Sequence, residues 1–273
     1  MAQRPLAGII LVAFGVSTPQ SKATVTLFED TVRAAFPEHP VYWAFTTRHN
    51  AKKNDTRSGE DLSLALALAK FAAMGITRVA VQPLHIIPGN EHTALAAELK
   101  AARRKYPKSL LTLGKPLITS KASFPALAQA MRTAASHSNV SSSASATEAL
   151  VWIGHGSPNN HTWYSDFAAY LMEQVPPILL GSLVGPPDLD QVLAIVRGKG
   201  SSKVCLAPFF AMAGNHALTD MGGPASHSWQ TRLGKAGIPC RILLQSMAAT
   251  NAFAVLWIDR LREALVEVNT PLP

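Results

Sequence analysis

The chain has 273 residues, a length that allows one large domain or two of ordinary size, and 48% of them are hydrophobic, which is enough for two cores. Its formal net charge is +8 and its pI is near 9.7, and these values favour an anionic partner. Lysine and arginine are not clustered among aromatic residues and no nucleic-acid-binding motif is present, so a polyanionic small molecule fits this charge better than nucleic acid does.

The N-terminal segment predicts the first strand of the fold. Arg4 followed by the apolar run from Gly8 to Phe14 is similar to a short secretory signal, but the run is at the short limit and no small-residue cleavage site follows it. No apolar stretch is long enough to span a membrane, so no membrane partner is expected. Cys205 and Cys240 are the only cysteines, so a disulfide framework is not expected and a cytoplasmic location is the default.

Apolar runs alternate with helical patterns along the first half of the chain. Proline or glycine marks the ends of several elements, such as Pro37 after the first helix and Gly75 after the second. This alternation predicts an α/β fold with a mostly parallel sheet and right-handed crossovers. The expected strands span residues 8–14, 40–46, 77–83 and 110–113, and the expected helices span 22–36, 60–74, 93–106 and 124–135.

The second half begins after a linker rich in serine, Ser136 to Thr147, which is too polar and small to join a core. We therefore expect an N-terminal lobe over 1–135, a linker over 136–147, a C-terminal lobe over 148–248 and a final helical segment over 249–273. Whether that last segment packs back on the first lobe stays open. The expected strands span 148–155, 178–184, 204–208 and 240–244, and the expected helices span 162–174, 188–198, 226–236 and 251–268.

An internal repeat links the two lobes. The segment from Val79 to Glu91 aligns without a gap with the segment from Val204 to His216, and valine, proline, glycine and asparagine recur in register. A looser repeat links residues 11–17 to residues 151–157, where His155 replaces Phe14. The repeat predicts two similar lobes related by duplication, with histidines in the second lobe and a carboxylate in the first.

Three residues at the carboxyl ends of expected strands are candidates for chemistry. His155 and His216 lie there in one lobe, where open α/β sheets bind ligands, and two converging imidazoles would suit a divalent metal. Glu91 occupies the equivalent place in the first lobe, and a pseudo-two-fold arrangement would aim it at the histidines. The alternatives are structural: the histidines could cap helices, and Glu91 could start a helix favoured by the macrodipole.

Other segments supply weaker candidates for ligand binding. His85 and His92 flank Glu91 and could orient it or only pack. The basic segment from Arg48 to Arg57 could contact an acidic ligand or remain a solvated loop. Met212 and its apolar neighbours could line a site for a flat ligand or belong to the core. No Walker, Rossmann or zinc-finger pattern is present and Ser157 lacks a nucleophile-elbow frame, so neither a nucleotide nor hydrolase chemistry is expected.

Three ordered motifs resemble the class II chelatases, and most closely the sirohydrochlorin cobaltochelatase group of the anaerobic cobalamin route. They are LHIIPGNEH at Leu84 to His92, GHGSP at Gly154 to Pro158 and AGNHALTDM at Ala213 to Met221. The resemblance covers most of the chain, and the linker rich in serine is its least similar stretch. It implies two flavodoxin-like lobes that face a central cleft, and insertion of Co2+ into sirohydrochlorin without a nucleotide, for which Fe2+ is the alternative metal.

The resemblance also implies roles for individual residues. His155 and His216 match the metal-binding histidines of the family, and Glu91 matches a glutamate that faces them. Imidazole and carboxylate are also suitable acceptors for the two pyrrole protons that leave as the metal enters. The eight carboxylates of sirohydrochlorin would explain the basic charge. The residues expected to bind the substrate are Phe14, Gly15, Arg48, His85, Gly89, Asn90 and Met212.

One residue departs from the family pattern. Some relatives carry an acidic ligand in the segment that matches Gly181 to Pro187, but here Val184 stands at the expected position. The metal would then be held by His155, His216 and water. Three alternatives to a cobalt chelatase stay open. They are an iron chelatase that makes sirohaem, a carrier that binds metal or tetrapyrrole without catalysis, and a two-lobed binding protein of the periplasmic type. Whether the chain forms a homo-oligomer stays open.

Overall fold

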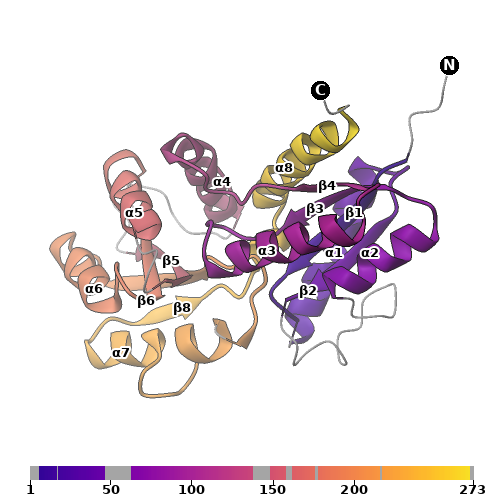
Figure 1. Ribbon diagram of the computed structural model, residues 1–273. Coiled ribbons are helices and arrows are strands. Elements are labelled where there is room, and N and C mark those ends of the chain that lie inside the picture. The colour runs from indigo at the N-terminus through magenta and orange to yellow at the C-terminus, as the bar shows by residue number, and fades with distance from the viewer. Residues whose placement is uncertain are drawn as a thin grey trace. The chain divides into compact units, whose positions relative to one another are not determined.

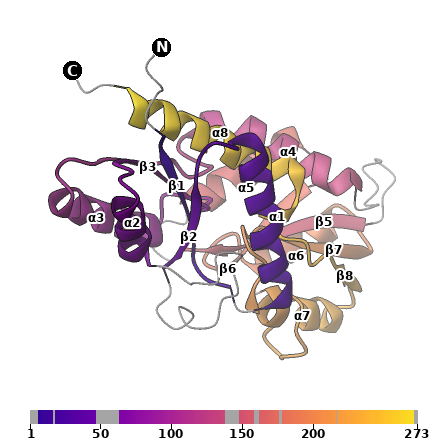
Figure 2. The same ribbon diagram turned by 90° about the vertical axis from the view of Figure 1, so that its right-hand side faces the viewer.

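The computed structural model describes residues 6–16, 18–46, 63–137, 148–157, 162–175, 178–215 and 217–270. Two compact units make up the chain. Unit 1 contains Met1–Thr119 and Ala254–Pro273, and unit 2 contains Ser120–Phe253. Each unit is a parallel sheet with helices packed against it (Figures 1 and 2).

The sheet of unit 1 has four parallel strands in the order β2-β1-β3-β4. Every residue of the central strand β1 is buried, which is typical of a parallel sheet with both faces covered by helices. The register places Ile10 of β1 beside Tyr42 of β2 and Val81 of β3. The strands are β1 (Gly8–Ala13), β2 (Val41–Phe45), β3 (Arg78–Pro83) and β4 (Leu110–Leu113).

Both faces of this sheet are covered by helices. The first carries α2 (Leu64–Ala73) and α3 (Asn90–Lys105), whose leucines form one core cluster with Ile10 and Val81. The second carries α1 (Pro19–Ala35) and α8 (Asn251–Asn269), where the ring of Phe28 lies 6.2 Å from that of Trp43 and 6.1 Å from that of Trp257. Helix α1 starts in a capping box between Thr18 and Ser21, with proline at its first position.

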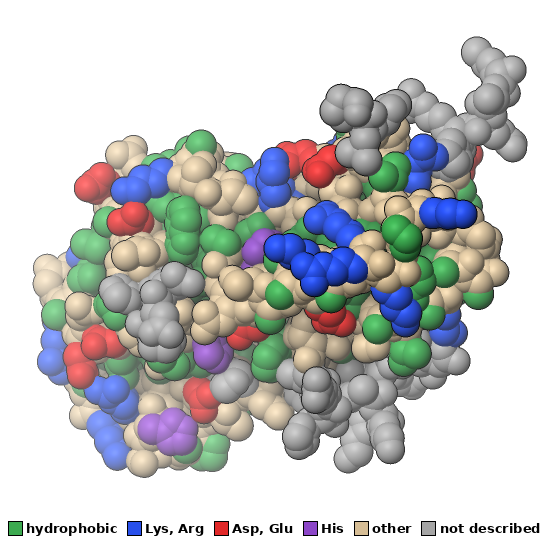
Figure 3. All heavy atoms as spheres, viewed as in Figure 1, with side chains coloured by type: hydrophobic (Ala, Val, Ile, Leu, Met, Phe, Trp, Pro, Cys, Tyr) green, Lys and Arg blue, Asp and Glu red, His purple; other side chains and the backbone are tan. Residues whose placement is uncertain are grey.

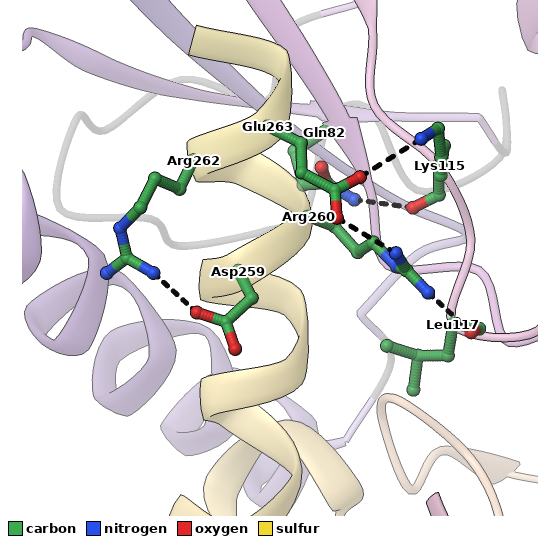
Figure 4. A network of polar contacts seen from close by, with 7 residues as sticks. All are labelled: Gln82, Lys115, Leu117, Asp259, Arg260, Arg262 and Glu263. Atoms are coloured by element: carbon green, nitrogen blue, oxygen red, sulfur yellow. Dashed lines mark hydrogen bonds and ion pairs between the residues drawn. The ribbon is translucent and has the colours of Figure 1, made fainter. Parts of the chain in front are cut away.

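Helix α8 is also held to unit 1 by polar contacts (Figure 4). Glu263 accepts a hydrogen bond from Lys115 at 3.1 Å and another from Arg260 at 3.1 Å. Arg260 in turn donates to the carbonyl of Leu117 at 3.3 Å, and the side chain of Gln82 donates to the carbonyl of Lys115 at 3.1 Å. The last helix of the chain therefore packs on the sheet formed by the first 119 residues.

The sheet of unit 2 repeats the strand order of unit 1, as β6-β5-β7-β8. The same order in both units is what a duplication predicts, and it confirms two similar α/β lobes. The strands are β5 (Glu148–Gly156), β6 (Ile178–Val184), β7 (Lys203–Pro208) and β8 (Cys240–Ile242). The helices of unit 2 are α4 (Phe124–His137), α5 (Thr162–Gln174), α6 (Leu189–Gly198) and α7 (Trp229–Lys235).

The predicted elements agree with the structure, with small shifts at their ends. The helix predicted over 93–106 begins at Asn90, because Gly89 is its N-cap, and the helix predicted over 226–236 begins at Trp229, because Ser228 caps it by accepting from the Thr231 amide. Two short 3₁₀ helices, at Lys121–Ser123 and Met247–Ala249, were not predicted, and the helix expected directly after position 216 is a short π-helix at Ala217–Met221. The π-helix directly follows position 216, a predicted site residue.

Candidate active site

His155 lies at the carboxyl end of β5, the central strand of unit 2, and its side chain is exposed. Its Nδ1 is 3.3 Å from the carbonyl oxygen of Gly156. In the tautomer in which Nδ1 donates to that carbonyl, Nε2 carries the lone pair that can bind a metal ion. The local geometry therefore suits a metal ligand at the place where the sequence predicts one.

Two glycines allow this histidine to lie between closely packed neighbours. A Cβ at Gly154 would lie 2.4 Å from the ring of Tyr164. At Gly156 the backbone has φ +76°, and a Cβ would lie 2.0 Å from the carbonyl oxygen of Val184. A side chain at either position would push β5 away from its neighbours, so the sequence Gly-His-Gly fixes where His155 emerges.

Val184 stands at the carboxyl end of β6, paired in register with Gly156. Its side chain is 39% exposed. An exposed valine one register position from His155 offers no ligand atom, so the departure seen in the sequence lies at the same edge of the sheet as the candidate metal ligand. Among the described residues, no group of three or more His, Cys, Asp or Glu side chains could hold a metal ion.

His216 lies outside the described residues, whereas the residues before and after it are described. The amide of Ala217 donates to the carbonyl of Gly214 at 3.1 Å. The π-helix that begins there carries Asp220, whose Oδ1 lies 3.4 Å from Nε2 of His227. This Asp220–His227 pair was not predicted from the sequence; the only signal was the spacing of Asp220, four residues after His216.

Glu91 lies in the first turn of α3, at the carboxyl edge of the sheet of unit 1. It is exposed, and its Oε2 lies 3.7 Å from where a Cβ on Gly89 would stand. Gly89 is the N-cap and gives the helix no side-chain hydrogen bond. The positive end of the helix dipole therefore lies beside this carboxylate and attracts negative charge.

His85 and His92 lie beside this helix start. Their ring centroids are 5.7 Å apart and the rings are nearly perpendicular, at 82°. Burial, and to a smaller extent the charge of His92, lowers the pKa of His85 from 6.5 to about 4. Burial also lowers the pKa of His92. Both imidazoles are therefore neutral near pH 7.

The remaining predicted substrate contacts lie at carboxyl edges within their own units, apart from Arg48, which lies outside the described residues. Phe14 follows β1 and is 58% exposed, with Gly15 next to it. Asn90 is exposed at the first position of α3. Met212 is half-buried in the loop after β7.

Among the described residues, lysine and arginine are scarce at these edges. In the described loops that follow β5, β6, β7 and β8 there is no lysine or arginine. Lys115, which follows β4, is paired with Glu263. Lys and Arg side chains gather instead over α3 (Figure 3), whose last turn carries Arg103, Arg104 and Lys105. None of the helices in the described part of the chain is long and apolar enough to cross a membrane.

The family model and the curated relatives that match this chain are all described as cobalt chelatases. A family model described as cobalt chelatase (CbiK) matches residues 7–266. The sirohydrochlorin cobaltochelatase CbiKC of Nitratidesulfovibrio vulgaris is 33% identical over 259 residues, which cover 94% of this chain and 90% of the relative. The sirohydrochlorin cobaltochelatase of Salmonella typhimurium is 31% identical over 265 residues, which cover 94% and 96%.

Solved structures agree on the fold. The sirohydrochlorin chelatase SirB from Bacillus subtilis subspecies spizizenii in complex with cobalt has a TM-score of 0.63 at 15% identity, covering 95% of both chains. SirB from Bacillus subtilis with Fe3+ has a TM-score of 0.67 at 15% identity, with the same coverage. At this level of identity the likeness shows a shared two-lobe α/β fold.

Proposed function

The chain belongs to the cobalt chelatase (CbiK) family, and we propose on this premise that it inserts Co2+ into sirohydrochlorin without a nucleotide. The observation that carries the proposal is the 33% identity to a sirohydrochlorin cobaltochelatase across 94% of the chain. The protein is accordingly a metal chelatase of the lyase class. Both substrates are consumed: the tetrapyrrole loses two pyrrole protons and gains one cobalt ion.

We assign the metal to His155 and His216. Neutral imidazole nitrogen is a suitable ligand for Co2+, and histidines at the carboxyl edge of a parallel sheet stand where such folds bind ligands. The hydrogen bond from Nδ1 of His155 to Gly156 leaves Nε2 directed to the ion. Water fills the positions that a carboxylate at 184 would otherwise take.

Glu91 acts as a proton acceptor. As the ion enters, two pyrrole N–H bonds break and two bonds from nitrogen to cobalt form, so two protons must leave. The Glu91 carboxylate at the start of α3 accepts one of them, and an imidazole released from the ion accepts the other. The protein changes only its protonation during the reaction, and it returns to its initial state when both protons reach solvent.

The periphery of the substrate carries carboxylates, and its face is flat and apolar. We assign the carboxylates to Arg48 and to the amides at the start of α3 around Gly89 and Asn90, where a helix end attracts anions. Phe14, Gly15 and Met212 contact the macrocycle. His85, which precedes Glu91 in the same loop and helix start, is assigned to the substrate as well.

The choice of metal ion and the cellular location belong to the same proposal. Cobalt is favoured by the names of the curated relatives, whereas imidazole ligands alone do not separate Co2+ from Fe2+. Iron insertion for sirohaem is therefore the second candidate function, because Val184 supplies no carboxylate that could separate the two ions. Cys205 and Cys240 are free thiols, in keeping with the reducing cytoplasm.

The test is anaerobic mixing of the purified protein with sirohydrochlorin and either Co2+ or Fe2+, followed by the absorption change of insertion. We expect multiple turnovers with cobalt at a higher kcat/KM than with iron. His155→Ala should reduce kcat/KM by about a hundredfold or more, since a ligand to the reacting ion is lost. His39→Ala is the matched control, because His39 contacts the carbonyl of Ala7 at the opposite edge of its sheet.

Three results would contradict parts of this proposal. Stoichiometric binding without turnover would make the protein a carrier. A higher kcat/KM for Fe2+ would make it an iron chelatase. Full activity of His155→Ala would overturn the assignment of the metal ligands.

A further inference from the structure

The pair of histidines beside Glu91 has three nitrogen atoms without partners. Nδ1 and Nε2 of His85 and Nδ1 of His92 are closed off from solvent, and none has a hydrogen-bond partner in the part of the chain that the structure describes. A buried polar atom without a partner destabilises the fold, so such atoms are rare in folded proteins. Three of them in two adjacent rings indicate a functional use.

The rings form a short path from the interior toward the surface. The backbone of His85 is fixed by a hydrogen bond, in which its carbonyl accepts from the amide of Leu117 at 3.2 Å. His92 is half-buried, and its Nε2 is not one of the buried atoms without a partner. His85 is therefore the inner member of the pair and His92 is the member that reaches solvent.

The pair is also next to the candidate proton acceptor in the chain. His92 follows Glu91 in the first turn of α3, and His85 lies 5.7 Å from His92 between ring centroids. Glu91 must lose its proton before another cycle, and a bound macrocycle would cover the side of the carboxylate that faces the substrate. A route for the proton on the protein side would solve this problem.

We propose that His85 and His92 form a relay that carries pyrrole protons from Glu91 to solvent. This inference rests on the proposed function, since it needs protons released by metal insertion. For each proton transferred, one ring nitrogen accepts the proton of the Glu91 carboxylic acid. The other ring nitrogen, which carries an N–H, then releases its proton. One proton leaves per passage, and reorientation of the ring restores the starting tautomer. A rotation of one ring, or one water between the rings, closes the gap between them.

The electrostatics suit a relay better than a proton store. Burial keeps the pKa of both rings below the ordinary value, and the positive end of α3 further disfavours a cation in its first turn. A proton therefore does not stay on either ring. A permanently protonated imidazole would instead repel a divalent ion that approaches Glu91. A metal site is a weaker explanation of the pair, because the described residues contain no third ligand beside it.

The test uses His85→Ala and His92→Ala in the full chain, with His39→Ala as the matched control. Stopped-flow absorption follows cobalt insertion, and a pH-indicator dye follows proton release in weakly buffered solution. We expect kcat to fall about tenfold, less than for loss of a direct proton acceptor, while KM for both substrates changes by less than about twofold. Added imidazole should restore most of the lost kcat in both variants and leave the control unchanged.

The outcomes separate the relay from the proposed function. If the wild-type chain inserts cobalt and both variants keep full kcat, the relay is wrong and the chelatase stands. If the variants lose kcat without rescue by imidazole, the pair has a structural role and the relay is likewise wrong. His92→Gln, at a half-buried position, serves as the second variant if His85→Ala does not fold; an unchanged kcat there also overturns the relay. A wild-type chain without turnover overturns both.

Discussion

At the scale of the residue, the position of His155 follows from the glycines on both sides of it. Gly156 at φ +76° and Gly154 under the ring of Tyr164 bring β5 close to its neighbours, and the histidine between them is the side chain that reaches solvent. The same close approach puts Val184 one register position away. The nature of residue 184 should therefore influence how the ion is held.

Substitution Val184→Glu should strengthen Co2+ binding. A carboxylate at the end of β6 would add a charged oxygen ligand beside His155, and one extra ligand worth about 1.4 kcal/mol lowers Kd by about tenfold. Because Val184 is already 39% exposed, the substitution should not unfold unit 2. Titration of the substrate-free protein with Co2+ measures the effect. Val184→Gln is the control of similar size without charge, and equal Kd values for the two variants would contradict the prediction.

The sequence allowed the place of His155 at the end of its strand to be predicted, because the determinants are local: a buried strand, two glycines and a repeat. Its role as a metal ligand stays a prediction. The sequence did not allow the His85–His92 contact to be predicted. These residues are seven positions apart, and only the turn from β3 into α3 brings their rings together. Glu91 was predicted from the repeat, although the uncapped start of α3 that surrounds it depends on Gly89, which the sequence-based boundary placed outside the helix.

At the scale of the element, α8 is the clearest case of a long-range contact. Its apolar side packs against the sheet of unit 1 through Trp257, which is fully buried against Phe28. The amphipathic pattern of residues 251–268 predicted a helix, but the pattern contains no information on which sheet receives it. The receiving surface is assembled from the distant segment Met1–Thr119.

Substitution Trp257→Ala should destabilise unit 1 strongly. Loss of a fully buried tryptophan leaves a cavity and typically costs about 3–5 kcal/mol. Urea unfolding followed by circular dichroism measures the loss. Val266→Ala on the same helix is the matched control, because Val266 is 64% exposed and surface substitutions stay within about 0.5 kcal/mol. A similar midpoint for both variants would show that α8 does not stabilise the unit.

At the scale of the whole molecule, the positive charge is unevenly divided. Unit 1 contains 17 lysines and arginines and 11 aspartates and glutamates, and unit 2 contains 8 and 6. The described loops at the carboxyl edge of unit 2 have no lysine or arginine. The composition predicted an anionic partner, but it could not show that most of the excess positive charge belongs to unit 1.

This division predicts how salt affects the reaction. If unit 1 chiefly attracts the anionic tetrapyrrole, KM should rise with ionic strength, because salt screens exposed charges beyond about 10 Å at 0.1 M. The value of kcat should change little. Steady-state rates from low to moderate salt measure both constants.

Arg48→Ala should raise KM at low salt and flatten its salt dependence. Arg104→Ala, in the last turn of α3 at the opposite end of the helix from Glu91, should keep the wild-type slope. Equal slopes for both variants would place the binding charge elsewhere on unit 1, and a KM independent of salt would show that the positive charge does not recruit the substrate.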